Sequence, residues 1–179
     1  IDQDGSGGAF IAWTDNRTNW NIYCTRVLPT GVIASGFPPD GLLICDNSST
    51  QDQTVLAYTG QGDCIVAWKG QSYSGGAYAV FANRVRGNGT IPTSWDSNGI
   101  FIVAEIQNGS NRQAQYPEII ADGCGGAIIS GESSYSNNDN DVSAQRVDSS
   151  GNLLWTSSWT GHLQISYSVN NDRNVKIAP

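Results

Sequence analysis

The chain has 179 residues and a formal net charge of −7, with nine Lys and Arg against sixteen Asp and Glu. No basic surface for the phosphates of DNA or RNA is therefore expected, and nucleic acid is not a predicted partner. Hydrophobic residues make up 39% of the chain and charged residues only 14%, which excludes disorder, and no apolar run reaches the roughly 18 residues of a membrane-spanning helix.

A threefold internal repeat dominates the sequence. Three blocks end in Arg-Val: 21–27, 79–85 and 141–147. Their arginines, Arg26, Arg84 and Arg146, are each followed by a Gly after five residues and by another ten residues later. The arginines are 58 and then 62 residues apart, and all of this length variation falls outside the matched blocks. Self-similarity at a fixed period is the signature of a repeat architecture.

Each repeat is predicted to contain four short strands. The first is clearest at 116–121 and ends at a Gly-rich turn, whose glycines supply the positive φ of a tight reversal. The second, such as 9–13, is almost continuously apolar, as a short strand covered on both faces requires. The third is the Arg-Val block, and the fourth follows the second repeated Gly, at 42–45 and 100–103. No segment is a good candidate for a helix.

Four-stranded antiparallel sheets that recur at about 60 residues without helices predict an all-β fold, a β-propeller segment of about three blades. The repeats span 1–50, which starts within a first strand, then 51–110 and 111–173, and 174–179 is predicted to start a strand of a further blade. Propellers have about four to eight blades, so three leave two open faces and an unpaired edge. We therefore expect further blades, or homo-oligomeric copies that close one ring.

Two recurring blocks carry a family resemblance. Asp-Gly-x-Gly-Gly-Ala-x-Ile-x-Trp and Ile-Tyr-x-x-Arg-Val resemble the tandem propeller-type repeats of large secreted or surface-displayed bacterial proteins. The likeness covers nearly the whole chain, with departures at Gly131, Ser143 and the cysteines. Asp148-x-x-Gly151-x-x-x-Trp155 is also distantly similar to the Asp-box of sialidase-type propellers, with a spacing one residue longer. The resemblance implies an extracellular or cell-surface β-propeller and does not imply one activity.

The repeated arginines and the single histidine are interpreted as structural. Because Arg26, Arg84 and Arg146 occupy one equivalent position per repeat, each is expected to bind carbonyls or an acid of a neighbouring turn rather than to form an anion clamp. His162 is the only histidine of the chain and follows the turn residue Gly161. It is predicted to be a solvated loop residue, and a His-rich metal site or a Ser-His-Asp triad is not supported.

The cysteines and the acidic turns leave alternatives open. Four cysteines lack the spacing of a zinc site: Cys24, Cys45, Cys64 and Cys124. At least one disulfide and small buried thiols are both compatible with them. Asp2-x-Asp4-Gly5 and the segment 137–141 offer oxygen ligands at alternate positions, but turn formation accounts for both. No cofactor is therefore expected, with calcium at 137–141 as the alternative.

Candidate binding residues lie in the connections between second and third strands, which are predicted to be long at 14–21, 69–79 and 132–141. These segments carry aromatic and acidic side chains: Trp20, Tyr73, Tyr78, Tyr135, Asp139 and Asp141. Exposed rings beside amide and carboxylate groups suit sugars, which offer an apolar face and a rim of hydroxyls. The alternative is that these rings only cover the edges of the blades.

The predicted function is a non-enzymatic extracellular module for adhesion, scaffolding, or glycan or protein binding through the long-loop face. One alternative is a fragment of a sialidase-type glycoside hydrolase, which needs an arginine cluster, a Tyr nucleophile and paired carboxylates. The scarcity of glutamate counts against this alternative, since only Glu105, Glu118 and Glu132 are present. Another alternative is a structural subunit of an extracellular assembly.

Overall fold

The computed structural model describes residues 1–71, 77–103, 113–136, 139–155, 161–166 and 172–178. These residues form three four-stranded antiparallel sheets in which strands pair in chain order. Sheet 1 contains β1 (Asp2–Gln3), β2 (Ala9–Asp15), β3 (Asn21–Val27) and β4 (Leu42–Cys45). Sheet 2 contains β5 (Gln51–Gly60), β6 (Asp63–Gln71), β7 (Tyr78–Val85) and β8 (Ile100–Val103). Sheet 3 contains β9 (Gln113–Ala121), β10 (Ala127–Ser136), β11 (Asp139–Val147) and β12 (Leu163–Gln164).

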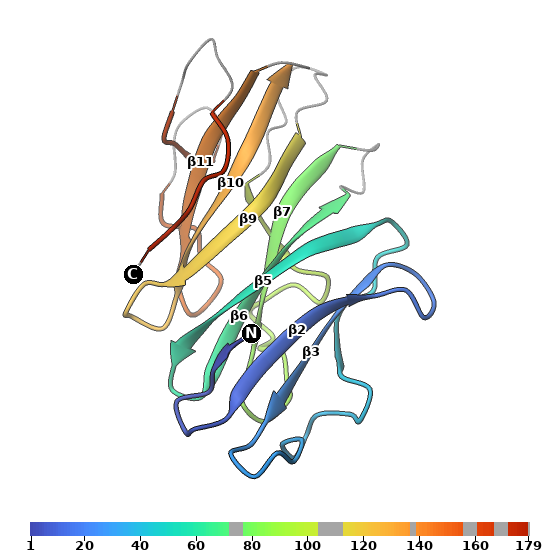
Figure 1. The fold of residues 1–179 in the computed structure, drawn as a ribbon. Helices are drawn as coiled ribbons and strands as arrows, with labels where there is room; N and C mark the ends of the chain where they lie inside the picture. The colour runs from blue at the N-terminus through green and yellow to red at the C-terminus, as the bar shows by residue number, and fades with distance from the viewer. Residues whose placement is uncertain (72–76, 104–112, 137–138, 156–160, 167–171, 179) are drawn as a thin grey trace.

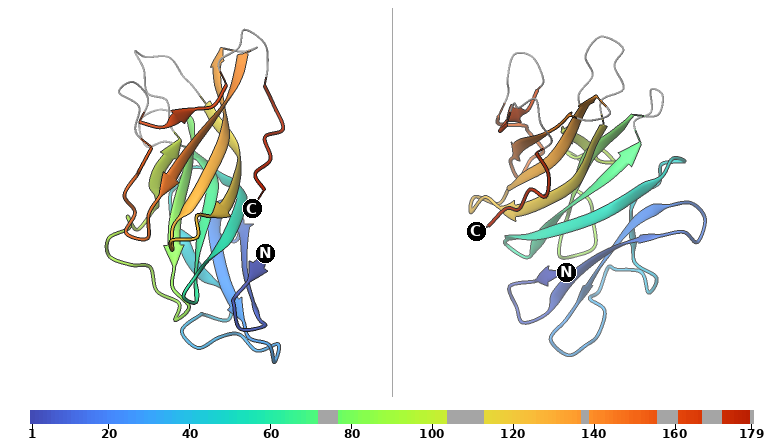
Figure 2. Two further views of the ribbon diagram at one scale, coloured as in Figure 1. Left: turned by 90° about the vertical axis from the view of Figure 1, so that its left-hand side faces the viewer. Right: turned by 45° about the horizontal axis from the view of Figure 1, so that its top comes forward.

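The three sheets lie side by side in chain order (Figures 1 and 2). The core consists of two clusters of buried side chains, one between sheets 1 and 2 and the other between sheets 2 and 3. The expectation of an all-β fold of three four-stranded units is thus confirmed. None of the described residues belongs to a helix, so no helix able to cross a membrane is found among them.

Strand β6 shows why the second strand of each repeat is so apolar. Because side chains alternate along a strand, Val66 and Trp68 enter the cluster shared with sheet 1, whereas Ile65 and Ala67 enter the cluster shared with sheet 3. All four are fully buried. The predicted burial on both faces is confirmed for β6, whereas in β2, which contains the predicted strand 9–13, only Phe10 is buried.

A Trp–Gly contact explains one of the repeated glycines. Gly99 has a φ of +88°, and a Cβ added to it would lie 2.5 Å from Cη2 of Trp68. Gly41 and Trp13 repeat the contact in sheet 1. In sheet 3 the Trp position is taken by Gly131, and a Cβ on the equivalent Gly161 would meet no atom of the described residues within 4 Å. The glycine is therefore needed for space only where the tryptophan is present.

The repeated arginines are scaffold residues, as predicted. Arg26 Nε donates to Asp4 Oδ2 at 2.9 Å, and Arg84 Nε donates to Asp63 Oδ2 at 3.0 Å. Arg146 Nε donates to Asp122 Oδ2 at 2.9 Å in the same way. Arg26 and Arg84 also donate to carbonyl oxygens of the following sheet, at 3.3 Å and 2.6 Å respectively. Each of these two arginines therefore joins its own turn to the next sheet.

The carboxylates of these pairs also cap their own turns. Burial raises the pKa of Asp122, but hydrogen bonds from the backbone N–H of Cys124, from Arg146 and from the N–H of Gly126 outweigh burial and hold that pKa below its ordinary value of 3.8. The pKa of Asp4 is lowered by an equivalent set of donors against the same effect of burial. Both carboxylates are thus stabilised in their charged form.

The outward face of sheet 1 repeats a surface that is buried in sheet 2. In sheet 2, the stacked rings of Trp68 and Phe81, with centroids 6.1 Å apart, are covered by sheet 1. The equivalent Trp13 and Tyr23 stack at 6.0 Å on the face of sheet 1 that points away from sheet 2. Leu43 pairs with Tyr23 on this face and is 38% exposed. Sheet 1 therefore presents the side chains of an inter-sheet contact on its open side.

Two predictions about sheet 3 are wrong. His162 is buried, with 2% of its surface exposed, and directly precedes β12, the fourth strand of sheet 3. The segment 132–141 is not a long loop, since β10 continues to Ser136 and β11 begins at Asp139. Polar partners inside the hairpin, such as the hydroxyls of Ser133 and Ser143 at 3.1 Å, allow this polar segment to remain a strand.

Candidate functional site

The candidate site is a pocket of about 530 Å³ between the starts of β5 and β9. We call it the first-strand pocket, because β5 and β9 are the first strands of sheets 2 and 3. Its lining comes from 53–55, 115–118 and 173–176, together with Glu132 and Asn140 from the β10–β11 hairpin. Segments of two sheets and of the C-terminal region therefore converge on it.

Irregular backbone recurs around this pocket. Gln53 and Tyr116 occupy equivalent positions of β5 and β9, and each has a φ of +54°. Asn174, also in the lining, has a φ of +60°. The pairing of β5 with β6 is interrupted between Asp52 and Val55, beside Gln53. Non-glycine residues with this conformation are uncommon and concentrate at binding sites, where a bulge redirects side chains.

The two bulges are joined across the sheets. The backbone N–H of Tyr116 donates to Oε1 of Gln53 at 2.6 Å. This hydrogen bond satisfies a donor that the irregular strand does not pair within its own sheet. Tyr116 itself is 52% exposed, so its ring is available at the pocket.

Glu132 supplies a buried carboxylate with one unused oxygen. Only 3% of the residue is exposed, and Oε1 accepts the backbone N–H of Asn174 at 2.6 Å. Oε2 is buried and has no hydrogen-bond partner among the described residues. Leaving a buried charged acceptor unpaired costs about 1–3 kcal/mol or more. A molecule that donates a hydrogen bond to Oε2 would remove this cost.

Charges at the pocket balance one another. Glu118 forms an ion pair with Lys176, and Arg173 also belongs to the lining. Two cationic side chains make the pocket a poor site for a metal ion, and no group of three or more His, Cys, Asp or Glu is assembled in the described part of the chain. A neutral ligand with several hydroxyl groups fits these charges better.

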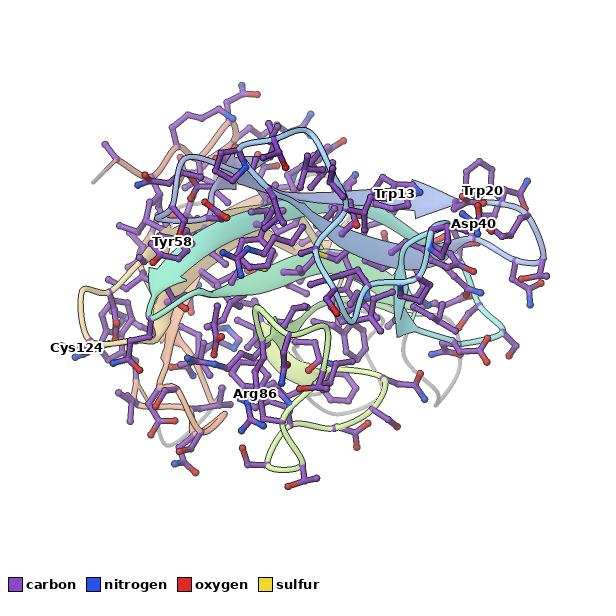
Figure 3. All side chains as sticks on the ribbon, turned by 90° about the horizontal axis from the view of Figure 1, so that it is seen from below. Trp13, Trp20, Asp40, Tyr58, Arg86 and Cys124 are labelled. Atoms are coloured by element: carbon purple, nitrogen blue, oxygen red, sulfur yellow. The ribbon has the colours of Figure 1, made fainter. Side chains whose placement is uncertain are left out.

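The residues predicted from the sequence lie outside this lining. Trp20 is 48% exposed, and its carbonyl accepts the N–H of Gln51 at 3.1 Å, close to the start of β5. Figure 3 shows Trp20 on the side of the molecule opposite Tyr58 and Cys124. Tyr78 lies against Lys69, whose Nζ is 4.5 Å from the ring centroid.

The remaining predicted residues fall in β10, β11 and the segment before β7. Asp141 is buried and accepts a hydrogen bond from Nε2 of Gln164 at 3.0 Å. Tyr73 lies outside the described residues, as do the side chains of Tyr135 and Asp139. The alternative calcium segment, 137–141, is described only in part for the same reason.

Sequence reasoning did not identify the first-strand pocket. The positions with positive φ hold Gln53, Tyr116 and Asn174, none of which is a glycine. Glu132 was singled out only as one of few glutamates. Its carboxylate contacts the C-terminal segment, where the N–H of Asn174 donates to Oε1. A contact between segments so far apart in the chain leaves no local sequence pattern.

Three stacked four-stranded meanders with a core between each pair define a β-propeller segment. The chain is similar in structure to an endo-arabinase from Bacteroides thetaiotaomicron, with a TM-score of 0.50 and 12% sequence identity over 93% of this chain. It spans 59% of that enzyme's length. No protein-family model and no curated protein matches the sequence. At this identity the likeness shows the fold alone.

Proposed function

We propose that this propeller segment is a non-enzymatic glycan-binding module and that the first-strand pocket holds the sugar. The observation that carries the proposal is Oε2 of buried Glu132, which lies at a polar pocket and has no hydrogen-bond partner among the described residues. An extracellular setting, in adhesion or scaffolding, follows from the family resemblance and belongs to the same proposal. Further blades or copies of the chain would complete the ring against the open face of sheet 1.

A sugar matches the chemistry of the lining. A hydroxyl donates to Oε2 of Glu132, and this charge-assisted bond is stronger than a neutral one. The exposed ring of Tyr116 offers a surface on which the apolar face of a pyranose or furanose can lie. Trp20, anchored through its carbonyl beside the start of β5, would extend this surface for a longer oligosaccharide. The name of the similar solved enzyme makes arabinose-containing oligosaccharides the first ligands to examine.

Binding is favoured over hydrolysis by the state of the two glutamates. Glycoside hydrolysis requires one carboxyl group as acid and a second as base or nucleophile. In the pocket, Glu118 is paired with Lys176, and Oε1 of Glu132 already accepts the Asn174 N–H. The described lining therefore offers one carboxylate oxygen for a ligand and a second carboxylate that is neutralised.

The test is titration of the protein with a panel of oligosaccharides by isothermal calorimetry, with Glu132→Gln as the central variant. The amide oxygen can still accept the Asn174 N–H, but the NH₂ group cannot accept a hydroxyl proton. We expect affinity to fall about 10- to 100-fold, the value of one charged hydrogen bond. Arg86→Ala, an exposed substitution in the turn between β7 and β8, is the matched control and should bind normally.

Two results would overturn this proposal. Unchanged affinity in Glu132→Gln would show that the sugar binds elsewhere, and the long-loop residues Trp20 and Tyr78 would then be substituted in turn. Release of shorter sugars during incubation, detected by chromatography and lost in Glu132→Gln, would show that the module is an enzyme.

A further inference from the structure

Two cysteines from different sheets belong to one cluster of the core. Cys24 lies on β3 of sheet 1 and Cys64 on β6 of sheet 2. Both are fully buried members of the cluster between these sheets. In the structure they are free thiols, as are Cys45 and Cys124. Their positions in the repeat differ, so a comparison of repeats does not reveal that they face one another.

The strand register shows that the positions of Cys24 and Cys64 hold small side chains at both interfaces between sheets. Cys24 pairs with Leu42 of the fourth strand as Ala82 pairs with Ile100, so Cys24 and Ala82 are equivalent. Cys64 pairs with Tyr58 of the first strand as Ala127 pairs with Ala121. At the interface between sheets 2 and 3, the two equivalent positions therefore hold Ala82 and Ala127. Both alanines are fully or almost fully buried in the second core cluster.

Small side chains at both positions indicate that the two backbones approach closely there. A disulfide needs such an approach, with Cα atoms about 4.4–6.8 Å apart. At the first interface, both small residues are cysteines, and both belong to the same buried cluster. Burial, followed by the neighbouring Cys24 thiol, raises the pKa of Cys64, so its thiol is unreactive once the sheets have packed.

We propose that Cys24 and Cys64 form a disulfide that crosslinks sheets 1 and 2 when the chain folds under oxidising conditions. The oxidant is a small-molecule disulfide such as oxidised glutathione. A Cys24 thiolate attacks it and displaces one glutathione thiolate, and the Cys64 thiolate then attacks the mixed disulfide and displaces the second. The protein loses two thiol protons and two electrons, and one glutathione disulfide becomes two glutathione thiols.

The bond would close a loop of about 40 residues, which spans the fourth strand of sheet 1 and the first strand of sheet 2. It would thereby restrict the unfolded chain and hold together the two sheets that share the larger apolar cluster. Loop closure of this length predicts a rise in the unfolding temperature of about 10 °C over the reduced protein. The fold itself does not require the bond, because Ala82 and Ala127 fill the same positions elsewhere.

The test is refolding in a glutathione redox buffer, followed by alkylation of free thiols, intact mass measurement and non-reducing peptide mapping. We expect loss of two hydrogens, a crosslinked peptide joining Cys24 to Cys64, and free Cys45 and Cys124. The unfolding temperature should fall on addition of a phosphine reductant. The control is the double variant Cys24→Ala/Cys64→Ala, which copies the Ala82–Ala127 pair. It should fold and show the same unfolding temperature with and without reductant.

The proposal fails if the wild-type chain refolds in the oxidising buffer with four alkylated cysteines. It also fails if the crosslinks involve Cys45 or Cys124. A Cys124→Ser variant removes the exposed thiol and prevents intermolecular bonds from obscuring the map. None of these results depends on the presence of a glycan, so the crosslink and the proposed function are tested separately.

Discussion

The Trp68–Gly99 contact gives a sharp prediction about stability. Replacing Gly99 with alanine forces an L-residue into a φ of +88° and places its Cβ 2.5 Å from Cη2 of Trp68. The backbone conformation costs about 1–2 kcal/mol. Trp68 is fully buried and stacked on Phe81, so it cannot move aside, and overpacking costs about another 1–3 kcal/mol. Gly99→Ala should therefore lower the free energy of unfolding by about 2–5 kcal/mol.

The chain supplies its own control for this prediction. Gly161 occupies the equivalent position with a φ of +72°, but among the residues that the structure describes an added Cβ would meet nothing within 4 Å. Gly161→Ala should cost only the conformational part, about 1–2 kcal/mol. The difference between the two variants isolates the clash with Trp68. Equilibrium urea unfolding followed by circular dichroism measures both. Equal destabilisation of the two variants, within about 0.5 kcal/mol, would refute the steric account of the repeated glycine.

Two further predictions concern the Asp–Arg pairs. Because the folded-state pKa values of Asp4 and Asp122 lie below 3.8, the stability that these carboxylates contribute is complete above that pH and is lost as pH falls through the folded values. Acid titration of unfolding free energy should show this loss, and Asp122→Asn should reduce it. Arg84→Met and Arg146→Met each leave a carboxylate without its cation, and Asp122 is the more buried acid, with 2% of its side chain exposed against 17% for Asp63. Each variant should therefore lower the free energy of unfolding by about 3 kcal/mol. A cost below about 1 kcal/mol in urea unfolding, as for an exposed ion pair, would contradict this reasoning.

The repeat made the architecture predictable from the sequence. Residues such as Ile65 and Val66 are apolar at successive positions, and a short strand tolerates this only between two layers. The recurring Arg-Val blocks indicated the positions of the third strands, and the recurring glycines indicated the positions of the turns. These features are local and periodic, so each copy supports the interpretation of the others. The structural role of the arginines was predictable for the same reason. A residue that recurs at one position of every sheet is expected to form a contact that every sheet contains.

The first-strand pocket was not predictable, because it depends on departures from the repeat. Positive φ at Gln53 and Tyr116 results from bulges whose residues differ between strands. His162 is buried directly before the fourth strand of sheet 3, whereas its neighbours in sequence indicated only a turn. The hairpin of β10 and β11 is polar, yet its pairing with β9 and its internal hydroxyl contacts extend it. In each case tertiary pairing overrides local composition.

The acid beside each repeated arginine shows what the repeat preserves. In sheets 1 and 3, the carboxylate comes from Asp4 and Asp122, before the turn, and a Cβ on Gly8 or Gly126 would collide with a carbonyl oxygen and that carboxylate. In sheet 2 the acid instead comes from Asp63, after the turn, at the position of those glycines. The turn there is rebuilt with positive φ at Gln61 and Gly62. An alignment of the three repeats by residue type finds no aspartate in sheet 2 at the position of Asp4 and Asp122. A carboxylate nevertheless lies beside the guanidinium of Arg84, because Asp63 supplies it. The feature that all three repeats keep is therefore a carboxylate beside the arginine. This carboxylate holds the guanidinium in place, and the arginines of sheets 1 and 2 each donate to a carbonyl oxygen of the next sheet.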